Sequence, residues 1–417
     1  MRVLLLTHSY DPESTPPQRR WAAFIGAFRR EGWDVDVVVP TAHPDRCAPH
    51  TSRGERGRAW TAGHGRHGEW IRRVPLLKHS ESRASKLFSH LMGAVFMVPA
   101  ALLGPRPDVV VVTVPALPNI AAGYAVSRLR RRPLVVEMRD AWPDLARDAD
   151  LVSGARPGLM ERIVAGVQRK ADLVVTVTRG FAELLRQRGC RDVVTVNNGI
   201  SLGTLPHGVP SAPPERQLHV LYLGNHGESQ GLETIIDAAR LAGEDVKVRF
   251  VGTGTRRMEL EEHARGVGAS IEFLPPSHGE ETTAHYAWAD TCVISLRDDW
   301  PSFDWTVPSK TYELLAVGRH ITGIVRGEAA RILTESGAAD VLPADPTAIA
   351  AFWREAARDR GRLQRDGLGR DWVRQHGDYG RLSRRYMDLI AERFGRTAEG
   401  PAVRTHGVRR KGEPRHG

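Results

Sequence analysis

Cysteine is scarce in this sequence. Cys47, Cys190 and Cys292 are the three cysteines among 417 residues, and no two of them have a paired spacing. This usage excludes a CxxC-type metal site and fits a reducing compartment. A full G-x-G-x-x-G motif is also missing after the first predicted strand, which disfavours a dinucleotide-binding protein.

Long hydrophobic runs are missing as well. The N-terminal segment MRVLLLTHSYDP has too short an apolar run for a signal peptide. The longest apolar run, Leu91–Leu103, is too short to span a bilayer, and we expect it to form a helix that packs against a sheet. A patch that touches lipid is the alternative. We therefore expect a cytoplasmic protein, and peripheral contact with the inner membrane face stays open.

Positive charge is in excess and is clustered. The formal net charge is +10, and the basic clusters are Arg46–Arg73, Arg128–Arg132 and the tail Arg396–Gly417, which we expect to be disordered. Such charge favours anionic partners, namely nucleotides, phosphorylated substrates or a membrane surface. No pattern of stacking aromatic residues accompanies it, so we expect no nucleic-acid partner.

Two series of alternating strands and helices predict two domains, since 417 residues are too many for one core. The strands are rich in Val, Ile and Leu, which predicts parallel sheets covered on both faces. The first series has predicted strands at Val3–Ser9, Val35–Pro40, Asp108–Pro115, Pro133–Asp140, Leu173–Thr178 and Val193–Gly199. The second has predicted strands at His219–Asn225, Lys247–Gly254, Ser270–Pro276, Thr291–Leu296 and His320–Val325.

The fold class is therefore α/β, with two doubly wound Rossmann-like domains and a ligand cleft at the carboxyl ends of the strands. A Pro-rich connector at Leu205–Gln217 separates them. We expect the N-terminal domain at residues 1–205 and the C-terminal domain at residues 206–378. A helix at residues 379–395 is expected to cross back to the first domain, before the tail at residues 396–417.

The stretch DWTVPSKTYELLAVG, Asp304–Gly318, predicts a loop and then a short amphipathic helix. Pro308 and Ser309 suit the first positions of a helix. The helix N-terminus beside Lys310 can bind an anion, and Glu313 could accept hydrogen bonds from a diol such as ribose. Phosphate beside ribose indicates a nucleotide. The alternative is an ordinary capped surface helix.

Five segments together resemble the GT-B glycosyltransferases of family 4, over about residues 1–395. They are RDAWPD, VNNGI, YLGNHGESQGLETIIDAA, FVGTG and VPSKTYELLAVG, the last ending at Gly318. The subgroup most similar to this chain includes the bacterial fucosamine transferases of O-antigen synthesis. This resemblance implies a GT-B fold, a nucleotide-diphosphate sugar as donor, retention of configuration and no metal or other cofactor.

On the donor side, the resemblance implies that Glu313 holds the ribose and that the helix N-terminus at Ser309 faces the pyrophosphate. Most family members carry another glutamate eight residues earlier. This chain has Trp305 there, and the neighbouring Asp304 is the candidate substitute.

Glycine-rich loops complete the predicted donor site. The loop Gly224–Gly231 follows a strand and precedes a helix, as a phosphate cradle does. Asn225 and Gln230 occupy the places where the family often has Arg and Lys, so Lys310 is the candidate cation for the diphosphate. Gly252 and Gly254 would permit close approach of the backbone near the nucleotide.

On the acceptor side, Arg139 and Asp140 end a buried strand and can orient sugar hydroxyls or the acceptor nucleophile. A structural ion pair between these two residues is the alternative. Asn198 is expected in a tight turn near the cleft. His8 and Arg19 flank a first loop in which prolines replace the family's glycines.

Two acidic motifs resemble manganese-binding carboxylates of another glycosyltransferase class. They are DVD at Asp34–Asp36 and DAD at Asp148–Asp150. Strand alternation would expose both acids of the first motif, so we expect solvated edges and no metal site.

The sequence thus predicts a retaining glycosyltransferase that acts on a sugar or small-molecule acceptor. Lipid-linked and soluble acceptors are both open. A GT-B-type nucleotide-sugar epimerase and a catalytically degenerate nucleotide-sugar-binding protein are the two rivals. The second rival is suggested by Trp305, Asn225 and Gln230, which replace charged residues of the family.

Overall fold

The computed structural model describes nine segments of the chain. They are residues 1–47, 51–52, 54–77, 83–114, 116–142, 144–148, 158–204, 216–365 and 367–395. The predicted disordered tail, most of the Pro-rich connector and part of the DAD motif lie outside these segments.

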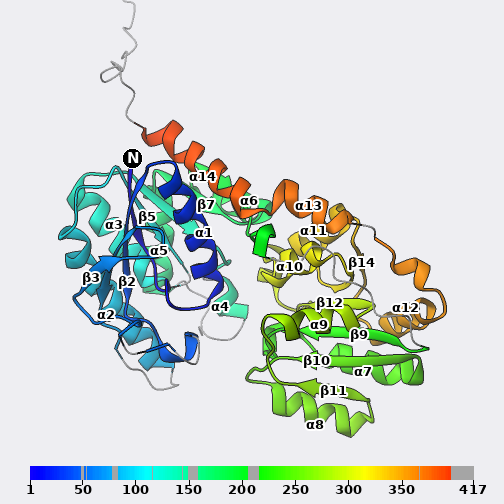
Figure 1. Cartoon of the computed structure of the whole chain (residues 1–417). Coiled ribbons are helices and arrows are strands. Elements are labelled where there is room, and N and C mark those ends of the chain that lie inside the picture. Colours follow the sequence, from blue (N-terminus) through cyan, green and yellow to red (C-terminus); the bar gives the residue numbers. More distant parts are fainter. Residues whose placement is uncertain are drawn as a thin grey trace, which may run out of the picture.

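Two parallel β-sheets form the centres of two domains that lie side by side (Figure 1). The first sheet has the strand order β3-β4-β2-β1-β5-β6-β7-β8, and β3 alone in it is antiparallel to its neighbour. Its strands are β1 (Arg2–Leu6), β2 (Asp34–Pro40), β3 (Ala62–His64), β4 (Trp70–Val74), β5 (Val109–Thr113), β6 (Leu134–Met138), β7 (Leu173–Thr176) and β8 (Val193–Thr195). The central strands are buried along their whole length and are apolar except for Thr113 in β5 and Glu137 in β6, as expected for a parallel sheet covered on both faces.

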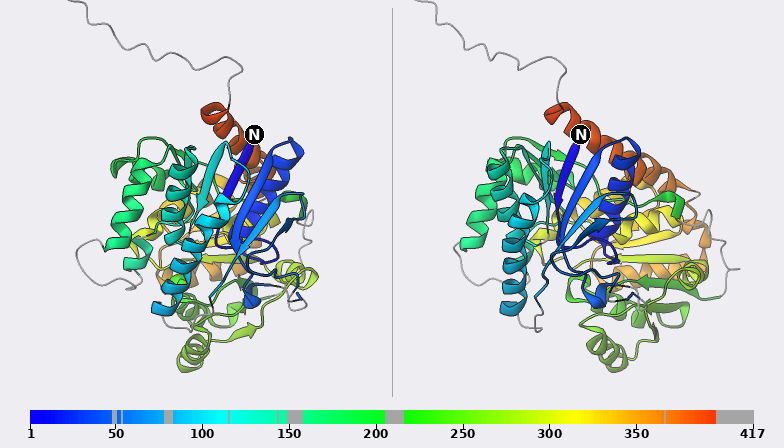
Figure 2. Two further views of the ribbon diagram at one scale, coloured as in Figure 1. Left: turned by 90° about the vertical axis from the view of Figure 1, so that its left-hand side faces the viewer. Right: turned by 60° about the vertical axis from the view of Figure 1, so that its left-hand side comes forward.

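Helices cover both faces of the first sheet (Figure 2). The helix α1 (Pro16–Arg30) packs on one face, where Trp21 and Phe24 are fully buried. The other face is covered by α2 (Arg83–Leu102), α3 (Pro118–Arg130), α5 (Leu159–Lys170) and α6 (Arg179–Gln187). A short helix, α4 (Asp144–Asp148), follows β6.

The second sheet has the order β11-β10-β9-β12-β13-β14, and all of its strand pairs are parallel. Its strands are β9 (Leu218–Leu223), β10 (Val246–Val251), β11 (Ile271–Leu274), β12 (Thr291–Ser295), β13 (His320–Ile324) and β14 (Ala339–Val341). One face is covered by α7 (Glu233–Ala242), α8 (Arg257–Val267) and α12 (Pro346–Arg358). The other is covered by α9 (Glu280–Trp288), α10 (Lys310–Val317), α11 (Gly327–Ser336) and α13 (Leu368–His376). The predicted fold class, α/β with two doubly wound domains, is confirmed.

The last helix, α14 (Tyr379–Phe394), leaves α13 of the second domain and packs against α1 of the first (Figure 1). Tyr386 and Ile390 are buried in the same core cluster as Trp21 and Phe24. The rings of Tyr386 and Trp21 meet edge to face at 5.7 Å, and this geometry adds a favourable aromatic contact to the area buried.

The basic segment Arg46–Arg73 has no predicted strand, yet part of it belongs to the first sheet. Residues 62–64 and 70–74 form β3 and β4, and β4 extends the sheet beside β2. The side chain of Glu69 is fully buried and accepts a hydrogen bond from the Tyr10 hydroxyl at 2.7 Å. An Arg-, His- and Gly-rich composition concealed this short pair of strands.

The expectation of two exposed acids in the DVD motif is also wrong. Asp36 is buried, and its carboxylate pairs with Arg72 at 2.8 Å and with Arg2 at 3.2 Å. Asp34 is exposed and pairs with Arg29 at 2.8 Å. Both carboxylates of the motif are therefore committed to arginines.

The apolar run Leu91–Leu103 lies mainly in α2, which packs against the sheet as expected. Within the described residues, no helix is long and apolar enough to cross a membrane.

Candidate active site

Two cavities adjoin each other between the domains. Their volumes are 750 Å³ and 450 Å³. Five residues line both cavities: Pro16, Arg139 and Asn198 from the first domain, and Ser309 and Lys310 from the second. Arg139 follows β6 and Asn198 follows β8, so the cleft lies at the carboxyl ends of the strands, where doubly wound sheets bind ligands.

The N-terminus of α10 forms the second-domain side of this cleft. Ser309 occupies the N-cap position, and its side chain makes no capping hydrogen bond. The first backbone N–H groups of a helix point outward and carry partial positive charge, so this end can bind an anion. The helix ends at Gly318, whose φ of +84° suits glycine.

Lys310 and Glu313 pair with each other at this helix start. The Lys310 ammonium lies 3.0 Å from each carboxylate oxygen of Glu313. The Tyr286 hydroxyl of α9 donates to the same carboxylate at 2.6 Å. Burial and the neighbouring carboxylate both raise the pKa of Tyr286, so the phenol stays protonated and remains a donor.

The loop Gly224–Gly231 holds itself together through its amide side chains. The Asn225 amide donates to the side-chain oxygen of Gln230 at 3.2 Å, and that oxygen also accepts from the Gly227 N–H at 3.1 Å. Gly224, Asn225 and Gln230 line the smaller cavity. Asn225 and Gln230 thus shape this loop through neutral hydrogen bonds.

Gly252 and Gly254 do not line either cleft cavity. Gly252 has a φ of +145°, and a side chain there would collide with the Gly224 carbonyl. A side chain at Gly254 would collide with the backbone of His226. The close approach that these glycines permit is therefore between two loops of the protein, and it fixes the position of the Gly224 turn.

His226 is enclosed by this packing of the two loops. Its ring is fully buried, and neither ring nitrogen has a hydrogen-bond partner. Burial, helped by the positive charge of Arg257, lowers the pKa of His226 to about 4. The ring is therefore neutral at pH 7.

Asp304 also lies outside the residues that line the two cavities. Its carboxylate pairs with the Arg326 guanidinium at 2.8 Å. The neighbouring Trp305 faces the first domain, where its carbonyl accepts from the Thr178 hydroxyl at 2.8 Å. In this structure Asp304 is thus engaged elsewhere, and Trp305 belongs to the contact between domains.

Arg139 and Asp140 both reach the cleft without pairing with each other. No ion pair joins either of them to any described residue within 4.0 Å, and the buried Nε atom of Arg139 has no hydrogen-bond partner. Asp140 lines the smaller cavity and Arg139 lines both. Burial raises the pKa of Asp140, and the charge of Arg139 opposes that shift. The alternative of a structural ion pair between them has no support in these contacts.

A buried network beneath Arg139 was not anticipated from the sequence. Arg20 pairs with Glu137 at 3.0 Å, and both side chains are fully buried. Arg20 also donates to the carbonyls of Val196 and Asn197, and the Trp21 indole N–H donates to Glu137 at 2.9 Å. The network fixes the segment that carries Asn198. The polar Glu137 inside the strand LVVEM was the signal that could have found it.

The three predicted acceptor-side residues divide between two places. Arg19 and Asn198 line the larger cleft cavity, and the buried Oδ1 atom of Asn198 has no partner. His8 instead lines a separate small cavity of 30 Å³ together with Glu13 and Asn119. Burial and the charge of Arg46 lower the pKa of His8 to about 3, so it is neutral at pH 7.

Hydrogen bonds between the two domains fix the walls of the cleft relative to each other. The Glu328 carboxylate of α11 accepts from the backbone N–H groups of Gly180 at 3.0 Å and of Arg179 at 3.3 Å. Asp148 of α4 accepts from the Ser302 N–H at 2.7 Å. In the described part of the chain, no group of three or more His, Cys, Asp or Glu residues is arranged to hold a metal ion.

Comparison with known proteins assigns this architecture to a class. Residues 17–199 match the family model "Glycosyl transferase 4-like domain". A curated relative is the provisionally assigned colanic acid biosynthesis glycosyl transferase WcaI of Escherichia coli K12. It is 24% identical over 338 residues, which cover 76% of this chain and 82% of WcaI.

Solved structures share the fold across nearly the whole chain. Sucrose-phosphate synthase from Thermosynechococcus elongatus has a TM-score of 0.71 at 15% identity, covering 94% of this chain and 99% of that one. Anabaena HepE in complex with UDP has a TM-score of 0.66 at 14% identity, covering 94% and 100%. The chain has the GT-B fold, and the residues of its first domain that match the family model are 17–199. These findings support a glycosyltransferase of the family-4, GT-B type.

Proposed function

We propose that this chain is a retaining glycosyltransferase that moves a sugar from a nucleotide-diphosphate donor to a nucleophile of an acceptor. One observation carries the proposal: the N-terminus of α10, with Ser309 and Lys310, lies across the cleft from Arg139 and Asn198 of the first domain. The solved HepE structures contain UDP, UDP with glucose, and UDP-glucose, which supports a nucleotide-sugar donor for this fold.

In this proposal the second domain binds the donor. The diphosphate would lie at the α10 N-terminus, where backbone N–H groups and Lys310 stabilise the charge that grows as the bond to the sugar breaks. Glu313 would accept hydrogen bonds from the ribose. Because a helix start and an ammonium can supply this charge stabilisation, we propose that the enzyme needs no metal. Unchanged turnover in a chelator would support that proposal.

The first domain would bind the acceptor. Arg139 and Asp140 would orient a hydroxyl toward the anomeric carbon of the donor sugar. The acceptor oxygen forms the new glycosidic bond, the bond to the diphosphate breaks, and the acceptor proton passes to the departing phosphate. The attack takes place on the face that the leaving group vacates, so configuration is retained. Asn198 would position either substrate at the boundary of the two domains.

The finer hypothesis concerns the sugars involved. The sequence motifs resemble fucosamine transferases of O-antigen synthesis, and WcaI is named for colanic acid, so we propose an acceptor on the route to an envelope polysaccharide. Such an acceptor can be lipid-linked, which would place the enzyme in the cytoplasm at the inner membrane face. A soluble acceptor would leave it free in the cytoplasm.

A two-stage experiment tests the proposed function. Thermal shift against nucleoside diphosphates and their sugars identifies the donor, since a ligand that binds the native state raises its apparent stability. Release of nucleoside diphosphate is then measured with and without candidate glycan acceptors. Release that requires an acceptor supports the transferase. Conversion of the donor sugar without acceptor indicates the epimerase, and binding with no turnover on any acceptor indicates the degenerate protein.

A further inference from the structure

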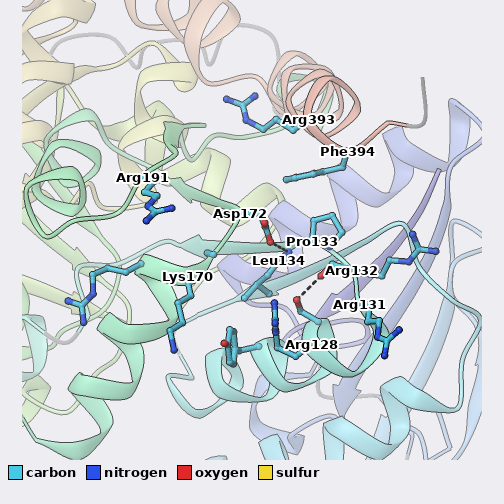
Figure 3. A pocket seen from close by; sticks show the side chains of 14 residues that line it. Arg128, Arg131, Arg132, Pro133, Leu134, Lys170, Asp172, Arg191, Arg393 and Phe394 are labelled. Carbon is cyan, nitrogen blue, oxygen red and sulfur yellow. Dashed lines mark hydrogen bonds between the residues drawn. The ribbon is translucent and has the colours of Figure 1, made fainter. Parts of the chain in front are cut away.

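A cavity of 1110 Å³ opens at the amino-terminal edge of the first sheet (Figure 3). We call it the basic pocket. The cleft lies at the opposite end of the strands. Leu134 at the start of β6 lines it, whereas Arg139 just after the same strand lines the cleft. Five residues of strand separate the two sites by about 16 Å. The basic pocket is therefore a different site from the donor and acceptor cavities.

Cations dominate the lining of this pocket. They come from the ends of α3, α5 and α14 and from the turns before β6 and β8 (Figure 3). The seven are Arg128, Arg131, Arg132, Arg169, Lys170, Arg191 and Arg393. The one acidic residue in the lining is Asp172, and its carboxylate accepts from the Leu134 N–H at 2.8 Å.

Most of this charge is not neutralised by the protein. Arg393 pairs with Asp192 at 2.7 Å. For the other six cations, the described residues place no carboxylate within ion-pair distance of 4.0 Å. Lys170 instead stands over the ring of Tyr124 at 5.7 Å. A concave surface with one sign of charge concentrates counter-ions, so this pocket attracts anions.

Helix dipoles explain only part of the cluster. Arg128, Arg169 and Lys170 lie in last helical turns, where cations are favourable whatever their function. Arg131 adopts a left-handed conformation with φ of +52°, at a position that glycine or asparagine usually occupies. The Nε atom of Arg132 is buried and has no partner. The helix dipole therefore accounts for neither of these two arginines.

The ligand is identified by its chemistry. Guanidinium groups match phosphate oxygens, with which they can form two hydrogen bonds at once. We propose that the basic pocket binds phosphate groups, either of a soluble polyphosphate or of anionic lipid head groups. The lipid source has its own support, because Leu103 and Leu129 are 79% and 63% exposed at this end of the domain. Arg130, which follows Leu129 at the end of α3, donates to the carbonyls of Leu102 and Gly104 on either side of Leu103.

The experiment uses the full chain and two probes: sodium tripolyphosphate in calorimetry, and co-sedimentation with phosphatidylcholine vesicles with and without phosphatidylglycerol. The double variant Arg128→Glu/Arg169→Glu should bind about tenfold more weakly, or worse, and the effect should shrink in high salt. The control variant Arg240→Glu/Lys247→Glu has the same change in charge on exposed residues of the second domain and should bind as the wild type does.

Arg131→Gly is the second test variant, because glycine accepts the left-handed conformation and should not destabilise the fold. It should also weaken binding. Binding of tripolyphosphate alone identifies a soluble ligand, and binding only to phosphatidylglycerol vesicles identifies the membrane. Binding to neither probe would overturn the proposal. Equal losses of binding in the test and control variants would also overturn it.

This inference is independent of the proposed function. Lys310→Ala should retain tripolyphosphate binding at the basic pocket, and the pocket variants should retain nucleoside diphosphate binding in the cleft. The two proposals can therefore fail separately.

Discussion

The Lys310 ammonium lies 3.0 Å from both carboxylate oxygens of Glu313, one turn along the same helix. Each of these groups is therefore the other's partner in this structure. A nucleotide that engages Glu313 through its ribose and Lys310 through its diphosphate must exchange this pair for contacts of its own. Tyr286 stays with Glu313 during such an exchange, because its hydroxyl already donates to one carboxylate oxygen at 2.6 Å.

Glu313→Gln should weaken donor binding by roughly 1–3 kcal/mol, the scale of a charge-assisted hydrogen bond. Calorimetry with the nucleoside diphosphate found in the thermal-shift screen measures the change. Tyr286→Phe is the matched control: it should cost less, because Lys310 still holds the carboxylate. Equal affinity of the wild type and the Gln variant, with the fold intact, would exclude Glu313 from ribose binding.

Lys310→Ala should lower kcat more than it lowers stability, because charge on the departing diphosphate is greatest in the transition state. Lys247→Ala removes an exposed lysine of the same domain and should leave turnover unchanged. Single-turnover kinetics at saturating donor provides the measurement. Wild-type turnover in Lys310→Ala would assign neutralisation of the diphosphate to another group.

Asp140→Asn should spare nucleotide affinity and cut transfer by about 10²-fold or more. The raised pKa of Asp140 adds a stability test. Between the unfolded and the higher folded pKa the native state binds more protons, so stability falls as pH rises through that window. The ionised carboxylate therefore costs stability at pH 7, and the Asn variant should melt at the wild-type temperature or above. A lower melting temperature with normal turnover would instead indicate a structural pair.

Glu328→Gln should loosen the contact between domains. The carboxylate accepts from two N–H groups at the start of α6, and loss of its charge should cost about 1 kcal/mol. Urea unfolding measures this cost. The control Glu335→Gln changes an exposed residue of the same helix that also pairs with Arg331, and it should have a smaller effect. Equal losses of unfolding free energy in the two variants would show that Glu328 contributes only through its ion pair with Arg331.

His226→Phe should reduce acid sensitivity. The folded pKa of about 4 lies below the ordinary value of 6.5, so the unfolded state binds more protons between these pH values. Wild-type stability is therefore complete above pH 6.5 and is lost as pH falls toward 4. Over this pH range the variant should lose less unfolding free energy than the wild type, by on the order of 1 kcal/mol. Urea unfolding at pH 7 and pH 4.5 checks this, with exposed His278→Ala as control.

The fold was accessible from sequence because its strands are long apolar runs. The strand at residues 109–113, VVVVT, is buried throughout and could be read directly. The strand β14 and the helix α11 were not predicted. The three residues of β14 are too few to show an alternating pattern. The hairpin of β3 and β4 was missed because arginines and histidines dominate its composition.

The candidate site was accessible only in part. Proline, serine and glycine marked both ends of α10, so Ser309, Lys310 and Glu313 could be located. Tyr286 could not, because it lies 27 residues away in α9 and meets Glu313 only through the packing of two helices. Asp304 was a candidate for the donor contact because it stands beside Trp305 in the sequence, and its ion pair with Arg326 could not be predicted from that position.

The return of α14 to the first domain determines how the protein can move and how it can be divided. The chain crosses between the domains where Ile200 meets Gly377 and Tyr379 through backbone hydrogen bonds of 2.9 Å and 3.0 Å. The second domain is thus inserted into the first, and both of its ends are anchored at one point. Any opening of the cleft is constrained to rotate about that point. A fragment that stops at residue 204 would leave Trp21, Phe24 and Phe28 without their cover, so the first domain should not fold without the end of the chain.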